Sequence, residues 1–304
     1  MNEAILFPGQ GAQFPGMGRA WCEAFPSAAK IFEQADRVLG FPLSDACWNQ
    51  GDAVHRTDIA QPGILTTSVA IATVLVDRGL DLAAASAVAG LSLGEYTALW
   101  AAGSLAFEDA LRLVRLRGQA MQAASEAIPS GMISLMGASL EQAQALARLG
   151  SAKGICSVAN LNAPGQIVVS GELAALDEVE ARAPEQGVRR ARRLVVAGGF
   201  HSECMRPASK ALAEALGKVT IRAPRVPFVT NVTGDFVSDP AQIRAYLADQ
   251  VCAPVLWEAS MLRLVASGRT RFLEPGPGEV LSGLLRKIAK DVAVRSVAEP
   301  AHLG

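Results

Sequence analysis

Histidine and cysteine are scarce in this sequence. Only three histidines occur, His55, His201 and His302, so a mechanism that needs an imidazole has few candidates. The five cysteines are scattered, odd in number and form no CxxC pair. This pattern excludes a disulfide framework and a cysteine-based metal site, and it predicts a cytoplasmic protein.

A surplus of charge is also missing. Lys+Arg 28 against Asp+Glu 29 gives a formal net charge of -1, which excludes the concentrated basic surface that nucleic-acid binding needs. Hydrophobic residues make up 50% of the 304 residues, so global disorder is excluded and the length allows about two domains.

Signals for secretion or membrane insertion are not expected either. The first residues, Met1-Asn2-Glu3-Ala4-Ile5-Leu6-Phe7, have no basic segment and predict a strand rather than a signal peptide. The uncharged stretches 82–94 and 96–107 are each shorter than the roughly 18 apolar residues that a membrane span requires. We therefore expect no membrane association.

Two patterns of elements follow each other along the chain. The first third predicts strands at 4–7 and 86–89 and helices at 61–76, 95–102 and 107–124, which is typical of an α/β domain with a mostly parallel sheet. The middle predicts a ferredoxin-like order, βαββαβ, from elements at 132–136, 140–149 (capped by Ser139), 155–160, 166–170, 172–183 and 188–196. Because α/β elements resume at 227–230, 271–273 and 280–288, the middle segment is predicted to be an insertion.

The pentapeptide Gly90-Leu91-Ser92-Leu93-Gly94 is a G-x-S-x-G motif between a predicted strand and a predicted helix. Small neighbours permit a strained turn that exposes the serine hydroxyl, and a helix N-terminus offers N–H groups to a developing oxyanion. A glycine-containing turn with an incidental serine is the alternative. The strand–turn–helix setting favours Ser92 as a nucleophile.

A serine nucleophile needs a general base. His55 falls in a predicted polar loop, and His302 falls near the end of the sequence, where fraying is expected. His201 follows an apolar strand in a small-residue loop. It is either a hydrogen-bonded structural histidine or, if Ser92 is a nucleophile, its base.

Arg117 lies on the apolar stripe of its predicted helix, together with Ala110, Val114 and Met121. A guanidinium that faces the interior is costly unless an anion or several acceptors satisfy it. A structural salt bridge is one explanation. A bidentate clamp for a substrate carboxylate is the other, and Ser92, 25 residues earlier, favours it.

The loop after the first strand, Phe7-Pro8-Gly9-Gln10-Gly11-Ala12-Gln13, is rich in glycine but lacks the Lys-Ser/Thr of a P-loop and the spacing of a dinucleotide fingerprint. In hydrolase-type α/β sites a loop in this position supplies the second oxyanion N–H. We assign that role to Gln10.

Segments in matching order and spacing resemble the malonyl-CoA–acyl carrier protein transacylases of fatty-acid and polyketide synthesis. They are 7–13, 61–62, 90–96, 115–121 (Arg-Leu-Arg-Gly-Gln-Ala-Met), 160–166 (Asn-Leu-Asn-Ala-Pro-Gly-Gln), 200–202 (Phe-His-Ser), 230–234 (Thr-Asn-Val-Thr-Gly) and 274–278 (Glu-Pro-Gly-Pro-Gly). The resemblance implies an α/β hydrolase-like catalytic domain formed by residues 1–127 and 198–304, with a ferredoxin-like small domain at 128–197.

The resemblance also implies a reaction. Ser92 would take the malonyl group from malonyl-CoA with His201 as base, and the phosphopantetheine thiol of acyl carrier protein would then accept it. The backbone carbonyl of Gln250 would orient His201. No cofactor and no metal are implied, and a monomer is expected.

Further site residues come from the same resemblance. The backbone N–H groups of Gln10 and Leu93 would form the oxyanion hole. The substrate-binding residues would be Arg117, which would hold the malonyl carboxylate, and Gln61, Met121, Asn160, Asn162 and Phe200.

The sequence departs from the family at two positions. Leu91 stands where a histidine is usual, so a role of that histidine in choosing the acyl group is lost. Gly199 stands where Pro or Ala is common, which predicts a looser loop around His201. Phe200 is expected to crowd an α-methyl group and favour malonyl over methylmalonyl.

Three other functions stay open. A hydrolase would release the acyl group to water, but such relatives are expected to lack the arginine at position 117. An acyltransferase for another CoA extender unit would keep the whole site. A catalytically silent docking module would lack Ser92 or His201, and the sequence contains both.

Overall fold

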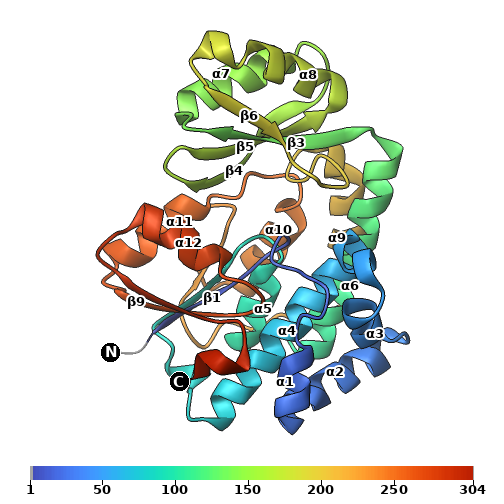
Figure 1. Ribbon diagram of the computed structural model, residues 1–304, viewed down its shortest axis with the longest axis vertical. Coiled ribbons are helices and arrows are strands. Elements are labelled where there is room, and N and C mark those ends of the chain that lie inside the picture. Colours follow the sequence, from blue (N-terminus) through green and yellow to red (C-terminus); the bar gives the residue numbers. More distant parts are fainter. Residues whose placement is uncertain (1–2, 304) are drawn as a thin grey trace.

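The computed structural model describes residues 3–303 (Figure 1). Its larger sheet has six strands in the order β10-β9-β1-β2-β7-β8. Neighbouring strands are parallel except β7 and β8, which confirms the α/β class with a mostly parallel sheet. The strands are β1 Ala4–Phe7, β2 Ala87–Gly90, β7 Phe228–Val229, β8 Phe236–Val237, β9 Arg271–Pro275 and β10 Ala293–Val297.

Helices cover both faces of this sheet (Figure 1). They are α1 Arg19–Ala24, α2 Pro26–Leu39, α3 Leu43–Trp48, α4 Thr57–Asp77, α5 Gly94–Ala101, α6 Phe107–Ala127, α9 Arg206–Leu216, α10 Pro240–Asp249, α11 Trp257–Ala266 and α12 Val280–Ile288. Strands β1 and β2 are buried at every residue, as strands between two helical layers must be.

The smaller sheet is antiparallel, in the order β4-β5-β3-β6, and it lies at the top of Figure 1 with α7 and α8 on its outer face. Its elements, in chain order, are β3 Ser130–Met136, α7 Leu140–Gly150, β4 Cys156–Ala163, β5 Gln166–Glu172, α8 Leu173–Arg182 and β6 Arg190–Arg193. The βαββαβ order is confirmed. The limits of the small domain at 128 and 197 stay a prediction, and all six elements fall inside them.

The two sheets are joined by the backbone as well as by the chain connections. Val255, which follows α10, forms a parallel bridge with β4. Its N–H donates to the carbonyl of Ala159 at 2.8 Å, and its carbonyl accepts the N–H of Leu161 at 3.0 Å. The outer edge of β4 is therefore anchored to the larger domain.

Helix α4 corrects the sequence analysis, which passed over the length of its apolar segment. Thr57–Asp77 is long and apolar enough to cross a membrane, with a mean hydropathy of 1.7 over an 18-residue window. However, 89% of that window is buried inside the protein, because α4 packs between α2 and α6. It is a core helix.

Two histidines also lie elsewhere than expected. His55 ends a 3-10 helix, Gly51–His55, rather than lying in a loop. His302 lies in another 3-10 helix, Pro300–Leu303, instead of a frayed end. Its Nδ1 accepts the backbone N–H of Ala298 at 3.3 Å, which links this segment to the residue that follows β10.

Candidate active site

Ser92 lies on a strained turn between β2 and α5. Its φ is +52°, and that of His201 is +59°; these are the only non-glycine residues in the described chain with a positive φ. Glycines make the turn possible. A Cβ on Gly90 would lie 2.0 Å from the carbonyl carbon of Gly94, and one on Gly94 would lie 2.1 Å from the carbonyl oxygen of Phe7. An incidental serine in an ordinary turn does not explain this geometry, since strain of this kind concentrates at functional sites.

Ser92 and His201 meet across 109 residues of sequence. The Oγ–Nε2 distance is 2.9 Å, and His201 Nδ1 lies 2.8 Å from the carbonyl oxygen of Gln250. Because a carbonyl only accepts, Nδ1 carries the proton and Nε2 is free to accept the hydroxyl proton of Ser92. The predicted base and its predicted orienting carbonyl therefore occupy the expected places.

The charge state of His201 suits a general base. Burial lowers the pKa of His201 to about 4, and the nearby positive charge of Arg117 acts in the same direction. The imidazole is therefore neutral at neutral pH and can take a proton.

The loop that carries His201 is tightly held. The N–H of Gly199 donates to Ser130 Oγ at 2.9 Å, and its carbonyl accepts the hydroxyl of Ser202 at 2.6 Å. A Cβ at Gly199 would lie 3.0 Å from the Cβ of Ser130 and 3.3 Å from Cys204 Sγ. Both backbone polar groups of Gly199 are bonded and there is little space around it, so these contacts oppose the expected loosening, which stays a prediction.

Arg117 is 1% exposed and points at the serine. Its Nη1 donates to Gln61 Oε1 at 2.8 Å, and its Nη2 donates to Ser92 Oγ and Gln250 Oε1, both at 3.0 Å. All of these acceptors are neutral, and in residues 3–303 no carboxylate lies within 4.0 Å of the guanidinium. Arg117 therefore does not form the structural salt bridge that the sequence analysis considered as an alternative.

A buried cation with no carboxylate in direct contact is costly, and burial lowers the pKa of Arg117, although Tyr96 and Glu95 act in the opposite direction. Its Nε, in addition, has no hydrogen-bond partner in the part of the chain that the structure describes. A site of this kind is prepared for an anionic group beside the serine hydroxyl.

Two residues that the sequence analysis did not select hold the turn together, Glu95 and Asn231. Asn231 Oδ1 accepts the N–H of Ser92 at 2.6 Å, and its Nδ2 donates to the carbonyl of Gly90 at 2.8 Å. Glu95 is fully buried; it accepts the N–H of Asn231 and, at 2.6 Å, Nε2 of Gln250. Burial raises the pKa of Glu95 to about 7, while these hydrogen bonds and Arg117 oppose the rise.

The two proposed oxyanion donors flank the serine. Leu93 immediately precedes α5, and Gln10 lies in the loop after β1. That loop passes close to the serine turn, because a Cβ on Gly9 would lie 2.2 Å from the carbonyl oxygen of Leu91. Within the described residues neither Leu93 N–H nor Gln10 N–H is engaged in a hydrogen bond, so both can receive an oxyanion.

A cavity of about 730 Å³ has Ser92 in its wall and is also lined by Met132, Asn160 and Val168 of the smaller sheet. Its wall includes these residues predicted from the sequence: Gln10, Ser92, Arg117, Met121, Asn160, Asn162, Phe200 and His201. Gln61, Leu93 and Gln250 are fully buried behind this wall. Gln61 touches the site through Arg117 and through Met121 Sδ, which lies 3.5 Å from its Nε2.

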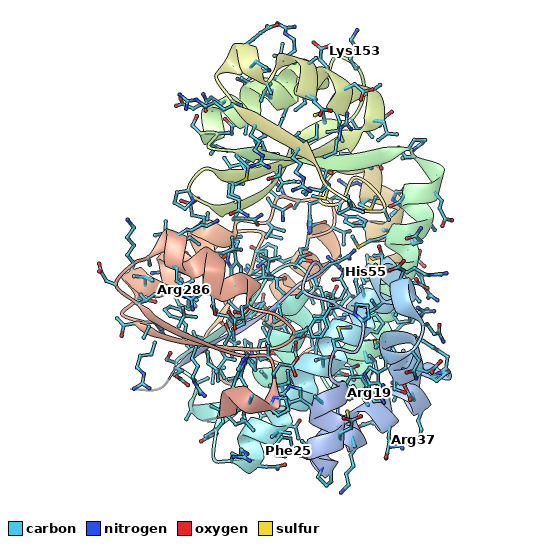
Figure 2. The ribbon with its side chains drawn as sticks, in the orientation of Figure 1. Arg19, Phe25, Arg37, His55, Lys153 and Arg286 are labelled. Carbon is cyan, nitrogen blue, oxygen red and sulfur yellow. The ribbon has the colours of Figure 1, made fainter. Side chains whose placement is uncertain are left out.

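The cavity wall also contains residues that the sequence did not suggest. His55, labelled in Figure 2, lines it from the 3-10 helix. Leu194, Val195 and Val196, expected to lie in a strand, instead follow the shorter β6 and form part of the rim. Only the fold brings these segments to the serine, so periodicity gave no signal for them.

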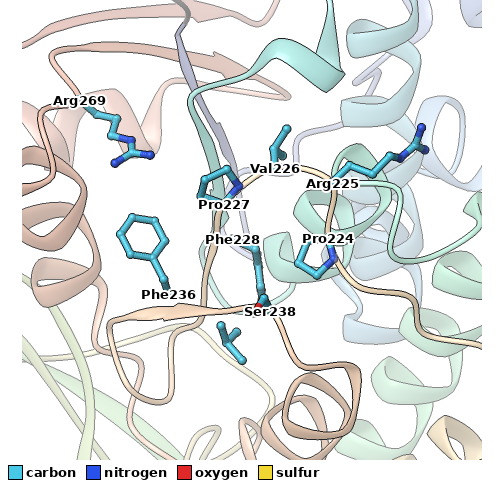
Figure 3. A pocket seen from close by; sticks show the side chains of 9 residues that line it. Pro224, Arg225, Val226, Pro227, Phe228, Phe236, Ser238 and Arg269 are labelled. Carbon is cyan, nitrogen blue, oxygen red and sulfur yellow. The ribbon is translucent and has the colours of Figure 1, made fainter.

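A second cavity of about 530 Å³ lies beside β7 and β8 (Figure 3). Phe236, Arg225 and Arg269 are among its lining residues, and it contains no nucleophile–base pair. No group of three or more His, Cys, Asp or Glu in residues 3–303 is arranged to hold a metal ion. The chemistry of the described chain is therefore concentrated at Ser92.

The mostly parallel sheet, the strained serine turn and the Ser92–His201 contact define an α/β enzyme of the hydrolase-like class. The acyl transferase domain family matches residues 5–301. The malonyl CoA-acyl carrier protein transacylase of Bacillus subtilis is 41% identical over 303 residues, which cover 98% of this chain and 93% of that protein. The chain therefore belongs to this family of acyltransferases, which confirms the resemblance inferred from its motifs.

Solved structures agree with this assignment. The acyl-carrier-protein S-malonyltransferase from Bartonella henselae has a TM-score of 0.96 and 38% identity, covering 99% of this chain and 97% of that one. A malonyl-transacylase solved in complex with its type II PKS acyl carrier protein has a TM-score of 0.94 and 34% identity, covering 100% and 98%.

Proposed function

We propose that this protein transfers the malonyl group of malonyl-CoA to the phosphopantetheine thiol of an acyl carrier protein through an ester on Ser92. The observation that supports it most strongly is Arg117, a buried guanidinium without a carboxylate partner, 3.0 Å from the serine hydroxyl. A malonyl thioester has a free carboxylate near its reacting carbonyl. An acetyl or longer simple acyl thioester lacks this group and would leave the arginine unpaired.

The first step is acyl transfer to the enzyme. His201 Nε2 takes the proton of Ser92 Oγ as this oxygen bonds to the thioester carbonyl carbon. The N–H groups of Gln10 and Leu93 stabilise the oxyanion. The C–S bond then breaks, and the CoA sulfur leaves with the proton that His201 holds.

The second step reverses these roles. His201 takes the proton of the phosphopantetheine thiol, and the sulfur attacks the ester carbonyl. The C–O bond to Ser92 breaks, and the serine oxygen recovers the proton from His201. The neutral state of His201 suits both steps, because each begins with the removal of a proton.

Phe200, which is 6% exposed and lines the cavity, is expected to limit which acyl groups fit the site. Its ring is expected to crowd an α-methyl substituent, so we propose malonyl-CoA rather than a branched extender unit as the substrate. We further propose a cytoplasmic location, consistent with five free cysteines in the described chain.

Intact-mass analysis tests this function. The protein is mixed with malonyl-CoA and then with holo acyl carrier protein, and the masses of both are followed. We expect a malonyl adduct on the wild type, no adduct on Ser92→Ala, and transfer of the adduct to the carrier. Release of malonate to water with no acylated carrier would instead identify a hydrolase.

A further inference from the structure

Glu95 lies at the centre of the contacts behind the serine. Its two carboxylate oxygens accept from different residues, one from the backbone N–H of Asn231 and one from Nε2 of Gln250 at 2.6 Å. Asn231 holds the N–H of Ser92, and Gln250 Nε2 also donates to the carbonyl of Ser92 at 3.0 Å. One buried side chain therefore supports both backbone polar groups of the serine.

The carboxylate also decides the orientation of the Gln250 amide. An amide has a donor end and an acceptor end, whereas both oxygens of Glu95 and the carbonyl of Ser92 accept hydrogen bonds here. Gln250 therefore turns its NH2 group toward Glu95 and Ser92, and the contact with Glu95, at 2.6 Å, is the shorter of the two. Its Oε1 is then left facing Arg117, where it accepts from Nη2 at 3.0 Å.

This arrangement supports the guanidinium without neutralising it. A carboxylate in direct contact with Arg117 would compete with an incoming substrate carboxylate. Because Gln250 stands between them, Glu95 fixes the position of Arg117 through a neutral amide. The positive charge near Ser92 stays available.

We propose that Glu95 is a positioning residue that selects for acyl groups with a carboxylate: it orients Gln250, and Gln250 orients Arg117. This inference rests on the proposed function. It assigns Glu95 to the choice of acyl group rather than only to the folding of the turn.

The test is the ratio of kcat/KM for malonyl loading to that for acetyl loading, measured by rapid quench and intact mass. In Glu95→Gln the backbone N–H of Asn231 can donate only to the oxygen of the new amide, so the NH2 group of that amide faces Gln250. Gln250 can accept a hydrogen bond from this NH2 group only by turning its oxygen away from Arg117. We expect the ratio to fall by about tenfold or more, the effect of one hydrogen bond to a charged group.

A second variant and a control accompany this measurement. Glu95→Asp keeps an acceptor but draws it back by one methylene, and we expect a smaller fall of about threefold. Glu274→Gln is the control, since Glu274 is also fully buried and accepts from Leu281 and Ser282 outside the cavity. Its ratio should equal that of the wild type.

The outcomes are distinct. Equal losses of malonyl and acetyl loading in Glu95→Gln, or an unchanged ratio, would overturn the proposal and leave Glu95 a structural residue. If Glu95→Gln does not fold, Glu95→Asp decides, and an unchanged ratio there would refute the inference. A wild type that does not load malonyl at all would refute the proposed function instead.

Discussion

Replacing Arg117 by alanine separates binding of the acyl group from the chemistry at the serine. Among the described residues that line the cavity, Arg117 is the only arginine or lysine, and its Nη2 lies 3.0 Å from Ser92 Oγ. We expect Arg117→Ala to weaken malonyl loading strongly. Acetyl loading should be unchanged or faster, because acetyl has no carboxylate and loss of the positive charge makes His201 a stronger base.

Two estimates give the size of the effect. A carboxylate about 4 Å from a cation at an effective dielectric constant of about 20 gains about 4 kcal/mol. Two charge-assisted hydrogen bonds contribute about 3–6 kcal/mol, of which part replaces the existing bonds to Gln61 and Gln250. Both values correspond to a loss of about 10²- to 10³-fold or more in kcat/KM for malonyl-CoA.

The assay is single-turnover loading with malonyl-CoA and acetyl-CoA under identical conditions. Arg115→Ala is the matched control, because Arg115 lies two residues before Arg117 on α6, does not line the cavity, and pairs with Asp58 at 2.9 Å. It should retain the wild-type preference for malonyl. Equal losses of malonyl and acetyl loading in Arg117→Ala would refute the clamp.

Three further predictions concern the base, the turn and the small domain. In ¹³C-histidine NMR, the pKa of His201 should lie near 4 and should rise in Arg117→Ala, and a signal that titrates near 6.5 would contradict the effect of burial. The free energy of unfolding should decrease as the pH falls from about 6.5 to about 4, because the unfolded chain binds more protons than the folded chain in this range. Gly94→Ala should lower the free energy of unfolding by more than about 3 kcal/mol in urea titrations, because the new Cβ meets the backbone of Phe7, and an unchanged midpoint would show that the turn can relax. Ser139→Ala should cost about 1 kcal/mol through the lost cap of α7 but leave loading rates unaltered, and slower loading would link the cap to the site.

The sequence was sufficient where the signal is local. The G-x-S-x-G spacing marks a tight turn, the apolar stripe of α6 places Arg117 inside, and the helix cap at Ser139 is formed as a capping box. These features depend on neighbours within a few residues, and they survive in the folded chain because packing agrees with them. The βαββαβ order was predictable for the same reason.

The features that the sequence did not predict depend on contacts between distant segments. Glu95 bonds to Asn231, which is 136 residues away in the sequence, and to Gln250, which is 155 residues away, so no local pattern predicts these contacts. One signal was available: Glu95 is a single charge between two uncharged stretches, 82–94 and 96–107, and a lone charge in buried surroundings needs partners. Helix α4 was predicted at 61–76, but the length of its apolar segment was passed over; its apolar residues lie on all sides, as in a helix buried by its neighbours.

The small domain is fastened to the larger one on two opposite sides. The bridge at Val255 holds the β4 edge, and the chain crosses between domains near β3 and β6, where Gly199 bonds to Ser130. A domain attached along one side can rotate about that side, whereas a domain attached along two opposite sides keeps its distance from the domain below it. In the proposed transfer, we therefore expect that turnover does not wait for the domains to close and that thioesters enter past the exposed side chains of Val195 and Val280.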